Sequence, residues 1–206
     1  MPRYFPVSAT ALLLALMAAC SNAPTTESNK TPEKAPEPVT GRHAFQNMYL
    51  SARAWAADAQ PVQLRSINLQ EMKSENGKAG AWQAAFVSTQ GARARSYTFS
   101  VLEAAGNLHQ GVFAGPVEGW SGPSGQSRPF LIAAIKIDSD EAYATAAKHS
   151  ADYIKKRADR PISFLLEQTN RYPDLAWRVI WGESVSSSDY SVFVDASTGA
   201  FLGTLH

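Results

Sequence analysis

The first half of the chain carries a hydrophobic pattern that predicts one helix followed by a small antiparallel sheet. Apolar side chains recur every three or four positions between Phe45 and Ala59, as on the buried face of an amphipathic helix. Pro61 stops this helix, and strand-like stretches follow it. The expected strands are 62–69, 81–88, 96–103 and 108–113. Residues 42–113 are therefore predicted to form a first helix-plus-sheet unit.

The second half repeats this order of elements over residues 135–206. Asp138 and Ser139 are candidate N-caps of a second helix, and Asp140 and Glu141 would lie in its first turn, where carboxylates suit the helix dipole. Pro161 stops that helix as Pro61 stops the first. The expected strands are 162–168, 175–181, 190–194 and 200–205.

The matching order of the halves predicts an α+β fold of two repeated units. Each unit has one helix packed on a small antiparallel sheet, and Trp82 corresponds to Trp177 as Gly106 corresponds to Gly199. The alternative is that a helix followed by a meander arises twice by chance. A unit of about 70 residues buries a marginal core alone, so we expect the two units to pack together or to share a sheet edge.

Residues 114–134 form the expected connection between the units and are rich in glycine and proline. Long irregular segments are often mobile or functional. In one interpretation the connection is a linker whose Trp120 fills a gap in a core. In the other, Trp120 and Arg128 contact a partner protein, with the tryptophan as anchor.

The N-terminus is typical of a bacterial export signal. A segment with one positive charge precedes an apolar run that is too short to span a bilayer but has the length of a signal-peptide core. The run ends in Leu16-Met17-Ala18-Ala19-Cys20, and small residues before a lone cysteine resemble the bacterial lipobox. We predict a signal peptide over 1–19 and lipid attachment at Cys20. An ordinary cleaved signal peptide and a buried N-terminal helix are the alternatives.

The residues after the signal peptide predict a flexible tether over 20–41. They hold four prolines and no aromatic residue, so they bury too little apolar surface to offset the entropy of ordering. Ser21 rather than aspartate follows the cysteine, which by analogy favours the outer membrane. The expected location is the cell envelope, at the periplasmic face of that membrane.

Composition excludes several classes of function. The chain has 19 lysines and arginines against 18 aspartates and glutamates, and the charges balance once the signal peptide is removed. A nucleic-acid binder needs a basic surplus or stripe, so that class is disfavoured. One cysteine excludes an internal disulfide framework and a cysteine-built metal site.

The search for catalytic chemistry is negative at the sequence level. The 4 histidines lie at no metal-ligand spacing, and neither a nucleophile motif nor a phosphate-binding loop is present. We therefore predict no catalytic residue, no metal and no cofactor. The 5 tryptophans suggest a ligand pocket, but four of them lie on periodic stretches that favour a place in the core.

The closing segment, Tyr190-Ser-Val-Phe-Val-Asp195-Ala-Ser-Thr-Gly199-Ala-Phe-Leu202, resembles the end of PepSY domains. In that family a strand leads into an Asp-Ala-x-Thr-Gly hairpin, which Asp195 and Gly199 match here. The resemblance covers residues 135–206, and the first unit resembles the family only weakly. It implies a cystatin-like helix on a sheet, no catalytic residues, and a binding module for which restraint of peptidases has been suggested.

Two classes of function follow from these observations. The first is a non-catalytic lipoprotein tethered to the membrane by its N-terminal lipid. It would bind an envelope protein, regulate a peptidase or act as a scaffold in an envelope complex. The second is a small-ligand carrier or small enzyme with a tryptophan-lined pocket between helix and sheet.

Overall fold

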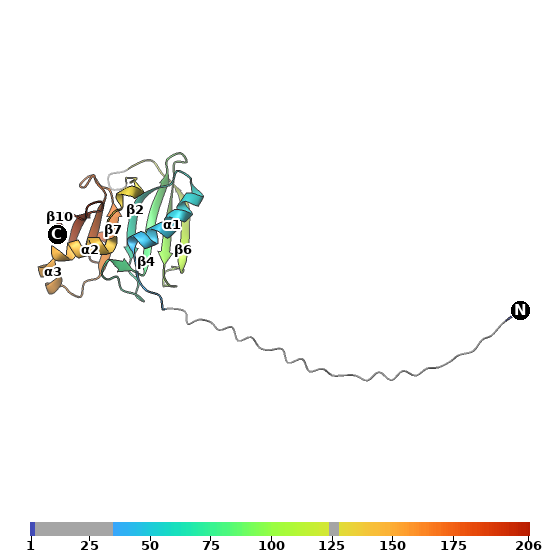
Figure 1. The fold of residues 1–206 in the computed structure, drawn as a ribbon, viewed down its shortest axis with the longest axis horizontal. Coiled ribbons are helices and arrows are strands. Elements are labelled where there is room, and N and C mark those ends of the chain that lie inside the picture. Colours follow the sequence, from blue (N-terminus) through green and yellow to red (C-terminus); the bar gives the residue numbers. More distant parts are fainter. Residues whose placement is uncertain (3–34, 124–127) are drawn as a thin grey trace, which may run out of the picture. The chain divides into compact units, whose positions relative to one another are not determined.

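The computed structural model describes residues 1–2, 35–123 and 128–206, and Ala35–His206 form a compact unit (Figure 1). Most of the predicted signal peptide, Cys20 and most of the predicted tether lie outside the described residues. In the described ranges no helix has the length and apolar character needed to cross a bilayer.

One antiparallel sheet of 8 strands dominates this unit, in the order β10-β9-β8-β7-β2-β4-β5-β6. The strands of the first half are β2 (Gln60–Ile67), β4 (Ala81–Ser88), β5 (Arg93–Ser100) and β6 (Gly111–Gly119). The strands of the second half are β7 (Ile162–Glu167), β8 (Ala176–Trp181), β9 (Tyr190–Asp195) and β10 (Phe201–Leu205). Two short strands, β1 (Val39–Thr40) and β3 (Lys78–Ala79), pair separately.

The helices lie across one face of the sheet (Figure 1). In the described part of the chain they are α1 (Gly41–Trp55), α2 (Ser139–Lys148) and α3 (Ala151–Lys156), with 3-10 turns η1 (Ile132–Ala134) and η2 (Val185–Ser187). This content confirms the predicted α+β class.

The two halves of the chain meet edge to edge in the middle of the sheet. Each half has a helix followed by four strands of that sheet, and β2 and β7 are the innermost strands. Residues 63–65 of β2 pair antiparallel with residues 165–167 of β7. The halves therefore share one continuous sheet, which is one of the two arrangements expected for units with marginal cores. Descent of both halves from one repeated unit stays a prediction.

Large side chains fill the space between the helices and the sheet. Trp82, Trp177 and Trp181 are at most 2% exposed, and all three belong to one apolar cluster with residues of α1 and α2. The rings of Trp82 and Trp177 meet edge to face with their centroids 6.4 Å apart. These three tryptophans therefore lie in the core, as their periodic stretches predicted.

The N-termini of α1 and α2 are joined by shared hydrogen bonds. Ser139 Oγ accepts from the Gly41 N–H at 2.7 Å and donates to the Gly77 carbonyl at 2.5 Å. Asp138 Oδ1 accepts from the backbone N–H groups of Ser139 at 2.7 Å and of Arg42 at 2.9 Å. The first backbone N–H groups of a helix have no partner within the helix. Here the side chains of two consecutive residues accept hydrogen bonds from such groups in both α1 and α2.

Trp82 and Trp177 make equivalent hydrogen bonds to the chain just before α1 and just before α2. Trp82 Nε1 donates to the Val39 carbonyl at 3.1 Å, and Trp177 Nε1 donates to the Ile137 carbonyl at 2.9 Å. Val39 lies two residues before α1, and Ile137 lies two residues before α2. Each indole therefore fixes the entry into the helix of its own half.

The prediction of an irregular connection over 114–134 is wrong for its first residues, because β6 continues to Gly119. Pro116 has no N–H to donate, and its strand is an edge strand with a neighbour on one side only. The register shifts where this part of β6 pairs with β5 between Arg95 and Tyr97. An edge position tolerates glycine and proline that an inner strand would not.

Two helix predictions also need correction. The first helix begins at Gly41 and ends at Trp55, and Pro61 lies inside β2, where it pairs with Phe86. The second helix is interrupted between α2 and α3. There the side chain of buried Ser150 donates to the hydroxyl of Tyr190 at 3.3 Å, so a tertiary contact coincides with the break.

Candidate functional site

The face of the sheet turned away from α1 and α2, here called the outer face, carries buried charged side chains. Strand alternation directs Trp177 and Val179 of β8 toward the helices, so Arg178 between them points to the outer face. Arg178 and Glu167 are each only 8% exposed there. Buried ionised groups are costly unless they are paired, so both side chains need a physical account.

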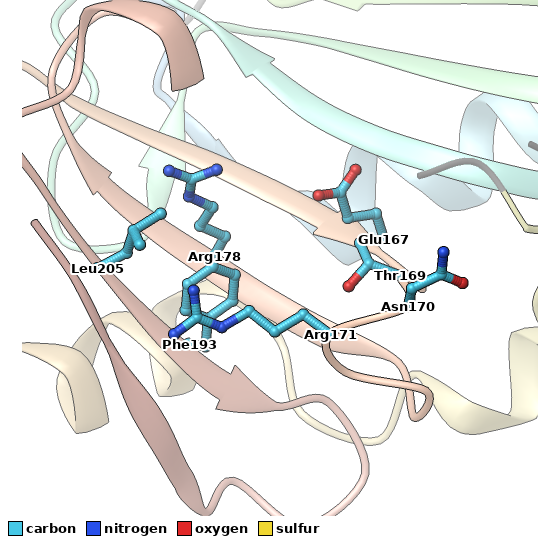
Figure 2. A pocket seen from close by; sticks show the side chains of 7 residues that line it. All are labelled: Glu167, Thr169, Asn170, Arg171, Arg178, Phe193 and Leu205. Atoms are coloured by element: carbon cyan, nitrogen blue, oxygen red, sulfur yellow. The ribbon is translucent and has the colours of Figure 1, made fainter. Parts of the chain in front are cut away.

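These residues belong to a hollow of about 430 Å³, here called the arginine cleft (Figure 2). It is lined by Glu167, Thr169, Asn170, Arg171, Arg178, Phe193 and Leu205. The strands β7, β8, β9 and β10 and the loop between β7 and β8 supply these side chains. The cleft is therefore built mainly on the rigid sheet, with one wall from a loop.

Two guanidinium groups lie over one aromatic ring in this cleft. The Cζ atom of Arg178 is 5.3 Å from the centroid of Phe193, its cross-strand neighbour, and that of Arg171 is 5.7 Å from the same centroid. Tyr172 packs on Phe193 from the loop, with centroids 4.6 Å apart. Cation–π contact offsets part of the cost of burying Arg178, but it uses none of its N–H donors.

Arg178 is held in an unfavourable electrostatic setting. Burial lowers the pKa of its guanidinium, the charge of Arg171 lowers it further, and the carboxylate of Glu167 opposes both effects. Its Nε atom is buried and has no hydrogen-bond partner among the described residues. A buried donor without an acceptor is a position where a bound ligand would be stabilised.

Glu167 is the second buried charge of the cleft. Its Oε2 accepts one hydrogen bond, from Gln63 Nε2 at 3.3 Å. Burial raises the pKa of this carboxyl group, while Gln63 and Arg178 act in the opposite direction. Within the described residues no ion pair at 4.0 Å or less joins Glu167 to Arg178. The two opposite charges therefore share one cleft without satisfying each other directly.

The raised pKa of Glu167 predicts a pH dependence of stability. The folded protein keeps this proton at pH values where the unfolded chain has released it, so the free energy of unfolding declines as pH rises from the ordinary glutamate pKa through the raised one. Glu167→Gln is expected to lack that decline and to gain stability relative to the wild type across it.

Urea unfolding of the wild type and Glu167→Gln between about pH 4 and 8 measures this effect. Glu118→Gln is the matched control, because Glu118 is exposed on β6. Parallel stability profiles for the wild type and Glu167→Gln would contradict the burial argument.

A second hollow of about 310 Å³, here called the apolar cleft, lies beside the first. Leu165 of β7 and Ile180 of β8 are among its lining residues, with Val185 of η2 from the loop before β9. Leu165 pairs directly with Arg178 across the two strands. The two clefts are therefore neighbours on β7 and β8, and together we call them the outer groove.

The structure places the two expected contact residues apart. Arg128 lies beside the arginine cleft, where its Nη2 donates to the side chain of Asn170 at 2.6 Å. Trp120 follows β6 at the other side of the sheet, and its backbone N–H donates to the Ala92 carbonyl at 2.9 Å. Of the two, Arg128 is the one that contacts a lining residue of the arginine cleft.

Asp195 and Gly199 shape the hairpin between β9 and β10. Asp195 Oδ1 accepts from the backbone N–H groups of Ser197 at 2.8 Å and Thr198 at 2.7 Å, and from the Thr198 hydroxyl at 2.9 Å. Gly199 has φ of +76° and donates its N–H to the Asp195 carbonyl at 2.9 Å. These contacts describe a turn, and Asp195 uses one carboxylate oxygen for all three.

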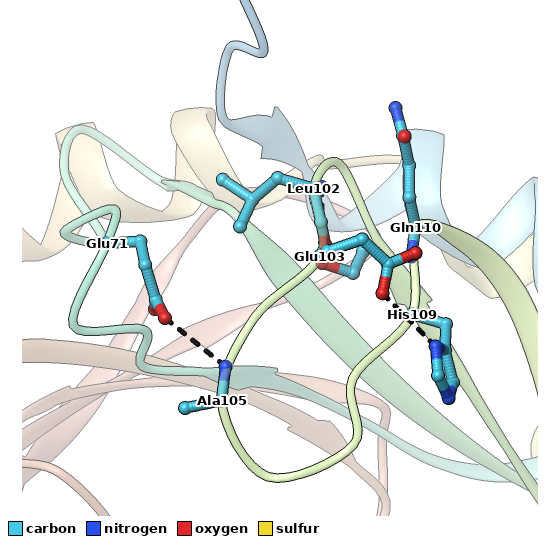
Figure 3. Close-up of polar contacts among 7 residues, drawn as sticks. Glu71, Leu102, Glu103, Ala105, His109 and Gln110 are labelled. Atoms are coloured by element: carbon cyan, nitrogen blue, oxygen red, sulfur yellow. Dashed lines mark hydrogen bonds and ion pairs between the residues drawn. The ribbon is translucent and has the colours of Figure 1, made fainter.

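A further polar cluster lies at the turn between β5 and β6 (Figure 3). Glu103 accepts from the backbone N–H of Gln110 at 3.0 Å and lies 3.1 Å from Nδ1 of His109. The Gln110 hydrogen bond is the main cause that lowers the pKa of Glu103. Glu71 reaches the backbone N–H of Ala105 at 3.2 Å. The groups are exposed and tie one loop to its neighbours, so we assign them to the structure of the turn.

Sequence reasoning missed Glu167 and Arg178. A signal existed, because each is a charged residue in a strand of mainly apolar residues, Ile162–Glu167 and Ala176–Trp181. The side chains of Cys20 and its neighbours lie outside the described residues. In the described ranges, no three histidine, cysteine, aspartate or glutamate side chains are grouped to hold a metal ion.

Comparison with known proteins yields one similar structure. No family model and no curated protein matches this chain. A crystal structure from Clostridium difficile 630, of a protein described there as a lipoprotein, is similar over 79% of this chain and 91% of that one. The identity is 11% and the TM-score is 0.48. A similarity at this level carries no functional argument, so the PepSY resemblance stays a prediction.

Proposed function

We propose that this chain is a lipid-anchored, non-catalytic binding protein of the cell envelope, with the outer groove as its binding site. The observation that carries the proposal is Arg178, a buried guanidinium with an unpartnered donor in a hollow beside an apolar cleft. The sequence before the compact unit supports the anchor, because a signal-like run ends at Cys20. The chain between Cys20 and Ala35 would give the site reach from the membrane.

The chemistry of the arginine cleft suits binding better than catalysis. Its ionisable side chains are Arg171, Arg178 and Glu167. Arginine stays protonated in proteins and presents a planar set of donors, which holds an anion but does not shuttle protons. The proposed partner is a protein or peptide of the envelope, at the periplasmic face of the outer membrane. A peptidase that the protein restrains, or a complex that it helps to assemble, would fit this role.

Site-directed photo-cross-linking in intact cells tests the proposal. A photoactivatable residue at Asn170, on the rim of the arginine cleft, is expected to form a discrete cross-linked species. The same residue at Gln46, exposed on α1, is the control for random encounter. Equal products from both positions, or none from Asn170, would contradict a binding site in the outer groove. The mass of the N-terminal peptide from the same cells measures the lipid on Cys20.

A further inference from the structure

We propose that the arginine cleft binds the free carboxyl end of a peptide, whose last side chains lie along the apolar cleft. This inference rests on the proposed function and names the ligand class of the same site. Three independent features of the cleft carry it: the two guanidinium groups, the buried carboxylate between them and β2, and the direction in which the groove continues.

The guanidinium groups supply a site for one carboxylate. Arg178 and Arg171 both lie close to the ring of Phe193, so their guanidinium groups belong to the same cleft (Figure 2). Arginine binds carboxylates through two parallel N–H groups, and such charge-assisted bonds are strongest where water is excluded. Arg178 is 8% exposed and its Nε is unpartnered among the described residues. A carboxylate would therefore satisfy a donor that the fold leaves open.

Glu167 decides which kind of anion fits. A sulfate ion or a fatty acid would place negative charge near this buried carboxylate and offer it no donor. The last residue of a peptide carries an N–H on the carbon next to its carboxylate. Glu167 pairs with Ala176 while Arg178 pairs with Leu165, so the two residues are diagonal neighbours on the sheet, with their backbones about 7–8 Å apart. A terminal residue can thus place its carboxylate on Arg178 and its N–H on Glu167.

The apolar cleft favours a peptide over a free amino acid. It adds about 310 Å³ next to the arginine cleft and continues over Leu165 and Ile180. Its polar side chains include Gln63 and Arg65 of β2, which can pair with the backbone of an extended chain. A single amino acid would leave this cleft empty, whereas a peptide of several residues would bury its side chains there.

Fluorescence anisotropy with the full chain in detergent micelles tests this inference. The probe is a fluorescein-labelled hexapeptide pool with randomised last three residues, prepared with a free carboxylate or with a terminal carboxamide. The free acid pool is expected to bind at least about tenfold more tightly, since a hydrogen-bonded ion pair is lost in the amide. Arg178→Gln should remove this preference.

Two further variants keep the test decisive. Arg171→Gln changes an exposed loop residue, so it should weaken the binding of the free acid pool without affecting the folding of the protein. Arg53→Gln removes an equal charge from α1 and should leave binding unchanged. Thermal unfolding of each variant shows that it is folded.

Several outcomes would overturn the inference. Equal binding of acid and amide pools would exclude carboxylate recognition, while peptide binding itself would leave the proposed function standing. Competition by free leucine, inorganic phosphate or palmitate as effective as that by the unlabelled acid pool would show a different ligand class. Absence of binding by both pools would also reject the inference. The cross-linking experiment at Asn170 would then test the proposed function independently.

Discussion

Gly77→Ala is expected to lower the free energy of unfolding by more than about 3 kcal/mol, from strained backbone and steric overlap together. Gly77 has φ of +81°, and a Cβ atom there would lie 2.1 Å from Cα and 2.4 Å from the backbone N of Asp140. The same atom would lie 2.5 Å from the carbonyl oxygen of Ser139. These are backbone atoms of the first turn of α2, so a side-chain rotation cannot relieve the overlap.

The matched control for this prediction is Gly106→Ala. Gly106 also has φ of +81°, but a Cβ atom there would meet nothing within 4 Å. Gly106→Ala should lower the free energy of unfolding by about 1 kcal/mol, which is the cost of the left-handed backbone alone. Urea denaturation of both variants measures the difference. Similar losses for the two variants would mean that the loop before β3 does not press against α2.

The expected damage at Gly77 extends to both helices. Its carbonyl accepts from Ser139 Oγ, which in turn accepts from the N–H of Gly41 in α1. Displacing this loop would break the hydrogen bonds that join the two helix N-termini. The junction lies on the helix side of the sheet, so we expect partially folded variants to lose the packing of α1 and α2 first.

Trp177→Ala is expected to destabilise the protein by about 3 to 5 kcal/mol, the usual cost of deleting a large buried aromatic side chain. Trp177 is 0% exposed, packs edge to face on Trp82, and donates to the Ile137 carbonyl at 2.9 Å. Its removal leaves a cavity between the halves of the molecule and an unpaired carbonyl at the entry to α2.

Two further substitutions separate these contributions. Trp177→Phe keeps most of the ring volume but loses the N–H, so it should cost about 1 to 3 kcal/mol. Trp120→Ala, at a partly exposed tryptophan after β6, should cost less than about 1 kcal/mol. Thermal and urea unfolding report all three variants. If Trp177→Ala lowered the free energy of unfolding as little as Trp120→Ala, the inference that the two halves share one core would be wrong.

Local patterns predicted much of the secondary structure. The alternation over 81–88 corresponds to β4, and the strands expected around Ile162, Trp177 and Tyr190 are β7, β8 and β9. Alternation reports burial of one face, which is a local property of a strand. The same reasoning did not predict the second part of β6, because an edge strand accepts glycine and proline and its sequence therefore resembles that of a loop.

Such patterns mark the two charged residues of the candidate site but do not predict that they lie together or that they are buried. Arg178 and Glu167 are each a single charge within a strand, and nothing local shows that loops and a neighbouring strand bury them. The site needs Phe193 of β9 next to β8 and Gln63 of β2 next to β7. These pairings join residues far apart in the chain, and strand order is not encoded in the period of one strand.

The sequence by itself determined that helix-then-strands order occurs twice and that an export-like segment precedes it, because both depend on hydrophobic period and residue type. The tertiary structure alone decided how the halves combine. Pairing of β2 with β7 makes one sheet, directs Trp82 and Trp177 into a common core, and leaves Arg178 and Glu167 buried on the other face. Burial depends on contacts between distant segments, and those contacts turn two ordinary charged residues into a candidate binding site.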